Sequence, residues 1–139
     1  MAYAVLEDLV QMVPTAELAQ LTAETGDIPD PAVVAEAIAR ADAEIDSYLA
    51  VRYQVPVAPV PERLKALSVE VALYHLYARR GVAPEVRRRG YDDAVAFLKL
   101  VAAGQAVIEG AGGEAPPSQQ AEEFAGASRQ FSRDGLGDW

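Results

Sequence analysis

The sequence LKALSVEVALYHLYAR, residues 64–79, carries the strongest structural signal in the chain. Its apolar residues fall on two neighbouring helical faces, one through Leu64, Leu67 and Val71 and the other through Val69 and Leu73. A helix that is apolar on nearly all sides is a buried helix, and about sixteen residues are too few to cross a membrane, which takes roughly 20. The pattern therefore predicts the central helix of a small helical domain.

Two shorter helices are predicted near the amino terminus. Residues 3–12 carry apolar residues at three- and four-residue spacing, and Pro14 ends that segment. Thr15 is predicted to cap the next helix, because its hydroxyl can accept a backbone N–H. Gly26 is predicted to end this second helix.

Two longer helices are predicted on either side of the central one. Asp30 and Pro31 favour a helix start, since a carboxylate caps the first turn and proline suits its first position. That helix is predicted over residues 31–52. Pro84 begins the last helix, residues 84–103, which Gly90 is expected to interrupt because glycine costs about 1 kcal/mol against alanine. The predicted buried face of this last helix is Val86, Tyr91, Ala94, Val95, Leu98, Val101 and Ala102.

Two stretches are not expected to be helical. Residues 54–61, QVPVAPVP, carry three prolines and are predicted to form a stiff connector. From Glu109 the chain has few large apolar residues and much Gly, Pro, Gln and Ser, which is typical of a flexible tether. The predicted fold is all-α: a small bundle of about five helices around a buried central helix, residues 1–108, with an extended carboxy-terminal arm, residues 109–139.

The end of the arm carries anchor residues separated by polar ones. Such a segment is typical of an arm that orders on a partner, and a frayed terminus is the alternative. The predicted residues that bind the partner are Arg129, Phe131, Arg133, Leu136 and Trp139.

Composition limits the classes of protein that this chain can be. Its 139 residues suit one domain, and the absence of cysteine excludes disulfides and thiolate metal sites. We expect a soluble protein that is made in a cytoplasm, since neither a signal pattern nor a transmembrane run is present. A net charge of -9 argues against a general nucleic-acid binder.

Charge is divided unevenly along the chain. Residues 1–50 hold ten acids and one base, residues 51–108 nine bases and five acids, and residues 109–139 six acids and two bases. One interpretation is solvated helix faces. The other is that an acidic face meets the basic face of a neighbouring subunit, and head-to-tail contacts of that kind close into rings. The predicted inter-subunit residues are Glu36, Asp42, Glu44 and Asp46 on the acidic side, with Arg79, Arg80, Arg87, Arg88 and Arg89 on the basic side.

No catalytic, cofactor-binding or metal-binding set is recognisable in the sequence. His75 is the only histidine and lies in the predicted buried helix, so we expect it to have a structural role. The run Asp42-x-Glu44-x-Asp46 resembles the start of a calcium loop but lacks the required glycine and the closing glutamate. We therefore expect a protein that is not an enzyme and needs no cofactor or metal.

Short blocks over most of the chain resemble one known family. The blocks are AYAVLEDL at 2–9, EL and LT at 17–22, DAEIDSYL at 42–49, RYQVPV at 52–57, YHLY at 74–77, YDDA at 91–94, FL at 97–98 and RQFSRD at 129–134. With them the chain resembles the Mu-like bacteriophage head–tail connector proteins, also called adaptor or neck proteins. Gly90 and the Gly/Pro/Gln stretch before the last block depart from the family's pattern.

The resemblance implies a structural part of the virion. Such adaptors form a ring, commonly dodecameric, beneath the portal and give a downstream neck or tail-completion protein its seat after DNA is packaged. It implies a portal partner, location in the virion neck after assembly in the host cytoplasm, and DNA that passes through the channel without specific binding. No membrane partner is implied. The alternatives are a cytoplasmic helical regulator that binds DNA or protein through residues 79–89, and a small enzyme that uses acidic residues.

Overall fold

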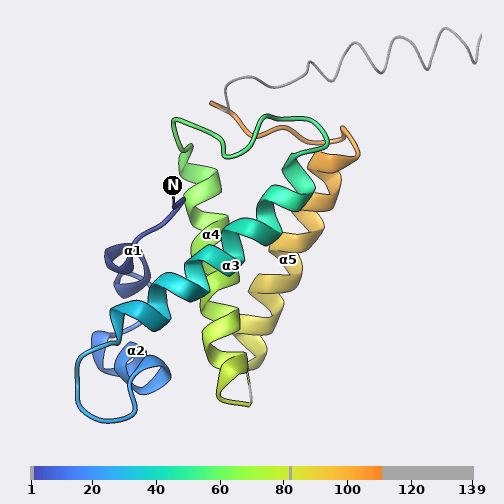
Figure 1. Ribbon diagram of the computed structural model, residues 1–139. Coiled ribbons are helices and arrows are strands. Elements are labelled where there is room, and N and C mark those ends of the chain that lie inside the picture. The colour runs from blue at the N-terminus through green and yellow to red at the C-terminus, as the bar shows by residue number, and fades with distance from the viewer. Residues whose placement is uncertain (1, 82, 111–139) are drawn as a thin grey trace, which may run out of the picture.

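The structure is a computed structural model that describes residues 2–81 and 83–110. These residues form five α-helices and no strand: α1 (Leu6–Val10), α2 (Thr15–Thr22), α3 (Pro31–Leu49), α4 (Glu62–Arg79) and α5 (Glu85–Ala102) (Figure 1). The prediction of a small all-α bundle is confirmed.

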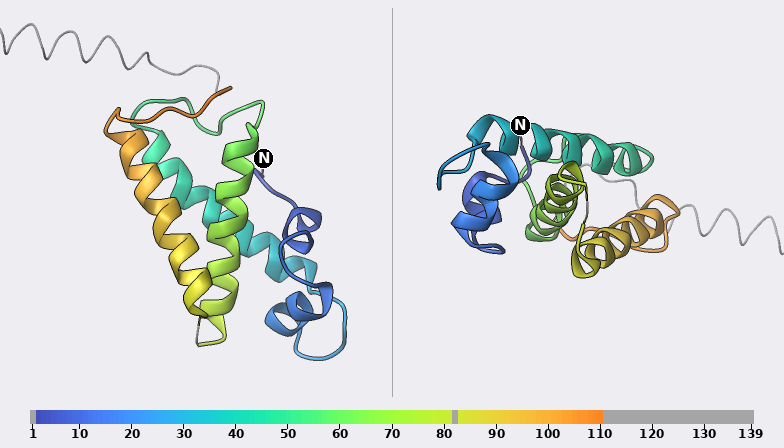
Figure 2. Two further views of the ribbon diagram at one scale, coloured as in Figure 1. Left: turned by 180° about the vertical axis from the view of Figure 1, so that it is seen from behind. Right: turned by 90° about the horizontal axis from the view of Figure 1, so that it is seen from below.

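The predicted central helix is α4. It contacts all four other helices and lies between α3 and α5 in the view from below (Figure 2). It begins at Glu62, directly after Pro61, and ends at Arg79 as predicted. Its buried residues are Leu64, Leu67, Ser68, Val69, Val71, Ala72, Leu73, Leu76 and Tyr77. The apolar residues on two faces of α4 are therefore explained by the other helices that pack against more than one of its sides.

Helix α3 begins as the sequence predicts. The Asp30 carboxylate accepts the backbone N–H of Ala32 at 3.0 Å, and Pro31 occupies the first helical position. The helix ends at Leu49, three residues before the predicted end, and Arg52 lies buried in the turn that follows. Helix α3 also contacts every other helix, so it shares the centre of the bundle with α4.

Helix α5 differs from its prediction at Gly90 and over part of its buried face, where Tyr91, Val95 and Ala102 are only partly buried. It runs unbroken through Gly90, where a Cβ would lie 2.2 Å from a carboxylate oxygen of Glu70 on α4. A larger residue at position 90 would therefore have to displace the end of the Glu70 side chain. Val86, predicted to be buried, is 67% exposed, whereas Ala94, Leu98 and Val101 are buried as predicted. Val86 lies in the first turn of α5, where the bundle does not cover it.

The amino-terminal region is less helical than its pattern predicts. Helix α1 spans only Leu6–Val10, and Tyr3 precedes it as a buried residue outside any helix. Pro14, and not Thr15, takes the cap position of α2. That helix ends at Thr22, well before Gly26, and the Thr22 hydroxyl donates to Leu18 O at 2.8 Å.

The connector and the chain after α5 lie together across one end of the bundle (Figure 1). Residues 54–61 are not helical, as predicted, and Val57 is 1% exposed. The Tyr53 hydroxyl accepts the backbone N–H of Ile108 at 3.1 Å, and Ile108 is itself buried. Residues 105–108 form no strand. Of the predicted arm, residues 109–139, the structure describes only 109 and 110, so the predicted division into two parts stays a prediction.

Candidate inter-subunit surfaces

Asp42 of α3 is a buried residue whose carboxylate accepts hydrogen bonds from the amino-terminal segment and from α4. One oxygen accepts the backbone N–H of Tyr3 at 2.9 Å, and the other accepts the hydroxyl of Ser68 on α4 at 2.7 Å. Burial raises the pKa of Asp42 above its ordinary value. With 8% of its surface exposed, Asp42 is used mainly within the subunit, and its contact with a neighbouring subunit stays a prediction.

Asp46 lies one helical turn further along α3 and also binds Tyr3. The Tyr3 hydroxyl donates to Asp46 Oδ1 at 2.5 Å and accepts the backbone N–H of Val57 at 3.0 Å. Burial raises the pKa of the Tyr3 phenol, and the hydrogen bond to Asp46 adds to that effect. Tyr3 thus joins the amino-terminal segment, α3 and the connector, a role that helical periodicity could not reveal.

Glu44 joins three helices. One carboxylate oxygen lies 3.2 Å from His75 Nε2 on α4, and the other accepts the hydroxyl of Tyr91 on α5 at 2.5 Å. The Tyr91 ring stacks on Tyr74 with ring centroids 4.2 Å apart. The hydrogen bond to Glu44, followed by burial, raises the pKa of Tyr91. Glu44 is therefore committed within the chain, and His75 is placed in a structural cluster.

Glu36 is the member of the predicted acidic set that remains exposed. It lies at a small pocket of about 140 Å³ between α3 and α4, together with Arg40, His75 and Arg79. Glu36 makes no ion pair with any described residue. It is thus available to a partner, unlike Asp42 and Glu44.

The predicted basic set divides into two groups. Arg79 Nη1 donates to Leu21 O at 2.9 Å, and Arg80 Nη2 donates to Ala23 O at 3.1 Å. These carbonyls belong to the end of α2, where the last helical C=O groups lack intrahelical partners. Arg79 and Arg80 therefore fasten α2 to α4 within one subunit, which the sequence did not predict.

The second basic group lies on α5. Arg87 is 3.9 Å from a Glu70 oxygen, and its guanidinium lies 6.0 Å from the centroid of the Tyr77 ring. Arg88 and Arg89 are exposed and make no hydrogen bond or ion pair with any described residue. Of the predicted basic residues, these two are the ones left for a partner.

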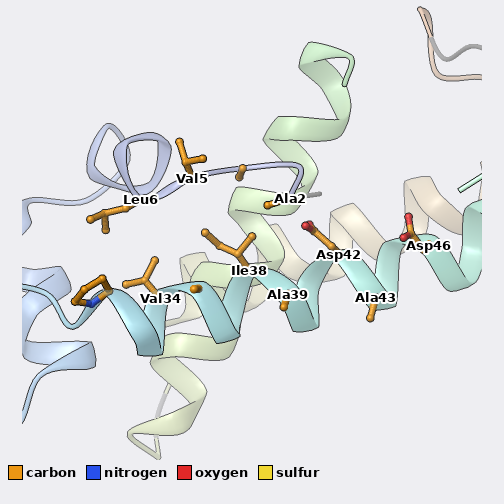
Figure 3. A pocket seen from close by; sticks show the side chains of 12 residues that line it. Ala2, Val5, Leu6, Val34, Ile38, Ala39, Asp42, Ala43 and Asp46 are labelled. Atoms are coloured by element: carbon orange, nitrogen blue, oxygen red, sulfur yellow. The ribbon is translucent and has the colours of Figure 1, made fainter. Parts of the chain in front are cut away.

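An apolar groove of about 540 Å³ opens between the amino-terminal segment and α3 (Figure 3). We call it the α3 groove. Its walls are mostly small or aliphatic side chains, among them Ala2, Val5, Leu6, Val34, Ile38 and Ala39. Figure 3 shows Asp42 and Asp46 at one end of it. Sequence reasoning missed the α3 groove, because one of its walls is an extended segment that had been expected to be helical.

A second groove, of about 510 Å³, lies between α4 and α5. Val86 and Arg89 line it, together with Met12 from the loop after α1. It is therefore bordered by the exposed first turn of α5.

Residues 2–81 and 83–110 offer no metal site and no membrane-spanning helix. No group of three or more His, Asp or Glu side chains there could hold a metal ion, and none of the five helices is long and apolar enough to cross a membrane. The predicted arm residues Arg129, Phe131, Arg133, Leu136 and Trp139 lie outside the described residues.

Comparison with known proteins gives three matches of one kind. A family model described as "Bacteriophage Mu, Gp36" matches residues 3–126. Gene product J of Escherichia phage Mu is 36% identical over 107 residues, which are 76% of this chain and 74% of that protein. The Mu-like prophage FluMu protein gp36 of Haemophilus influenzae is 40% identical over 75 residues, or 54% of this chain. That match spans about half of the Haemophilus protein, 52% of its length.

These matches confirm the resemblance to Mu-like phage proteins that the sequence blocks indicated. The family match extends from the buried Tyr3, through all five helices, into the residues beyond Gly110. The chain belongs to the Bacteriophage Mu Gp36 family.

Proposed function

We propose that the chain is a structural virion protein, a head–tail connector that forms a ring beneath the portal. In this role it attaches after DNA is packaged and gives the neck or tail-completion protein its seat. The role is not enzymatic and uses no cofactor. Membership of a Mu phage family over residues 3–126 carries the proposal, because the connector role is what the resemblance to that family implies.

The surface chemistry supports assembly from many copies. Exposed Arg88 and Arg89 lie on α5, while acidic residues outnumber basic ones ten to one over residues 1–50. Opposite charges on unlike faces of one subunit favour head-to-tail contacts, which close into rings when the rotation allows. The proposed ring is a dodecamer, as is common in proteins of this kind.

The net charge of -9 suits a channel that DNA traverses. A protein binds DNA without sequence preference by replacing counterions at the phosphates with Lys and Arg. A negative ring offers little of that gain, so packaged DNA passes through without specific binding. The proposed partners are therefore further copies of the chain, the portal and a downstream neck protein.

A phage whose gene for this protein carries an early stop codon tests the role. We expect DNA-filled heads and separate, complete tails in the lysate, counted by electron microscopy. Supplying the protein from a plasmid should restore joined particles. Joined, infectious particles without the protein would contradict the proposal.

The alternative is a helical regulator that binds DNA or protein through residues 79–89. Its basic segment is smaller than the sequence suggested, because Arg79 and Arg80 bind the end of α2 and Arg87 lies beside Glu70. Titration of a labelled duplex with the full chain separates the two functions. Binding that disappears in Arg88→Ala/Arg89→Ala would favour the regulator.

A further inference from the structure

The first two turns of α5 expose an apolar side chain beside unpartnered cations. Val86 is 67% exposed. Arg89 follows it by three residues, which places the two side chains on the same face of the helix. Arg89 has no hydrogen-bond or ion-pair partner among the described residues. A single exposed valine is ordinary, but an apolar side chain beside an unpartnered arginine forms a small surface of defined chemistry.

The α3 groove offers the complementary chemistry. Its volume of about 540 Å³ leaves room for side chains from a partner. Both oxygens of Asp42 are used within the chain. Asp46 binds Tyr3 through Oδ1 alone, so within the described residues its second oxygen has no partner. The groove is thus apolar along its length, with one acceptor available at its end.

We propose that the α3 groove receives the first two turns of α5, residues 84–90, from a second copy of this chain. Val86 enters between the amino-terminal segment and α3, and Arg89 meets Asp46. The proposal rests on the ring described above and names the contact that builds it. Charge complementarity selects this occupant, because a carboxylate pairs more strongly with a guanidinium than with a neutral donor, and Arg89 is an exposed guanidinium.

The arrangement of the two surfaces requires separate copies. The amino-terminal segment and α5 lie on opposite sides of α4 in Figures 1 and 2. One subunit therefore cannot fill its own groove, and each copy has one groove and one α5 turn to offer. Contacts between unlike surfaces are head-to-tail and generate a ring when the rotation closes.

Disulfide trapping tests the contact cleanly because the chain has no cysteine. The full-length double variant Ala39→Cys/Val86→Cys places one thiol in the groove and one on α5. Under mild oxidation we expect a ladder of covalent multimers, while each single variant stays monomeric on denaturing gels. The matched control is Ala32→Cys/Leu100→Cys, two exposed positions on the same helices that do not line the groove, and it should give no ladder.

The outcomes that would overturn the contact are distinct. A covalent dimer of the Ala39→Cys single variant would mean that two grooves face each other across a two-fold axis. Self-association without covalent multimers of the double variant would also contradict the contact. So would a chain that sedimentation shows to be monomeric at every concentration tested. If the protein forms a ring in the virion neck but the cysteine variant gives no covalent multimers, only the proposed contact is wrong. If the neck lacks the protein, the proposed function is wrong.

Substitutions that fill the α3 groove test the contact independently of disulfide formation. Ala39→Trp should weaken self-association about tenfold or more, since a blocked central contact costs at least about 1.4 kcal/mol. Arg89→Glu should do the same, while Ala32→Trp and Leu100→Ser should leave association unchanged. Melting temperatures of all four variants establish that each one folds. Association of folded Ala39→Trp at the wild-type strength would contradict the proposal.

Discussion

Single residues of α4 and α3 determine how the bundle holds together. Leu67 is 5% exposed, and Asp42 joins the amino-terminal segment to α3 and α4 through both of its carboxylate oxygens. Leu67 stabilises the bundle through burial of apolar surface, and Asp42 through hydrogen bonds to a buried carboxyl group. These two contributions respond differently to mutation and to pH.

Leu67→Ala should lower the free energy of unfolding by about 2–5 kcal/mol, the usual range for a core leucine. Leu100→Ala is the matched control, because Leu100 is 45% exposed and its truncation leaves no cavity. Urea denaturation followed by circular dichroism measures both. Equal, near-zero losses for the two variants would contradict the burial of α4.

Asp42→Asn should change how stability depends on pH. Burial raises the folded-state pKa of Asp42 above its ordinary value of 3.8, so between those two pKa values the folded protein binds more protons than the unfolded chain. The contribution of Asp42 to stability is therefore greatest at low pH and declines as pH rises through this window. The wild type minus Asp42→Asn difference should be larger at about pH 4 than at about pH 7.

Because the two proteins share every other titrating group, the groups remote from Asp42 cancel in that difference. A difference that grows as pH rises would mean that the hydrogen bonds from Tyr3 and Ser68 outweigh burial.

At the scale of whole elements, helix periodicity predicted which faces are buried but not which partners the polar residues find. The pattern of residues 64–79 was enough to place α4, because burial on two sides is visible in one short segment. Tyr3 could not be placed, since its partners Asp42, Asp46 and Val57 are distant in the sequence. Arg79 and Arg80 were predicted to contact a neighbouring subunit. Within the subunit, their guanidinium groups donate hydrogen bonds to the carbonyl groups at the end of α2.

Gly90 is a second residue whose contact with another helix could not be predicted from helix periodicity. Gly90→Ala adds about 1 kcal/mol of helix propensity but pushes the Glu70 carboxylate away from its place near Arg87. A surface ion pair contributes about 0–1 kcal/mol, so the net change should lie within about 1 kcal/mol of zero.

The matched background is Glu70→Ala, in which the conflict with a Cβ at position 90 is removed. There Gly90→Ala should stabilise by the full helix-propensity term, about 1 kcal/mol. Thermal unfolding of the four proteins completes the double-mutant cycle. An equal effect of Gly90→Ala in both backgrounds would show that Glu70 does not explain the glycine.

At the scale of the molecule, the helical bundle and the residues beyond Gly110 are expected to have separate tasks. The five helices carry the buried cluster, the α3 groove and the exposed turn of α5. The sequence beyond residue 110 carries Phe131, Leu136 and Trp139, which we propose as anchors for the portal or an adjacent subunit. Deletion experiments distinguish a binding arm from a part of the core.

Removal of residues 126–139 should leave helix content and melting temperature nearly unchanged, while heads and tails fail to join. Circular dichroism and counts of joined particles measure the two effects. The triple variant Phe131→Ala/Leu136→Ala/Trp139→Ala should reproduce the joining defect if the anchors are responsible. Unfolding of the truncated subunit would show that these residues belong to the core.

Electron cryomicroscopy of the virion neck tests the connector role most directly. We expect a ring of this chain between the portal and the first tail component, with the first two turns of α5 of each copy bound in the α3 groove of the next. A neck in which the portal meets the tail without any density for this chain would contradict the connector role.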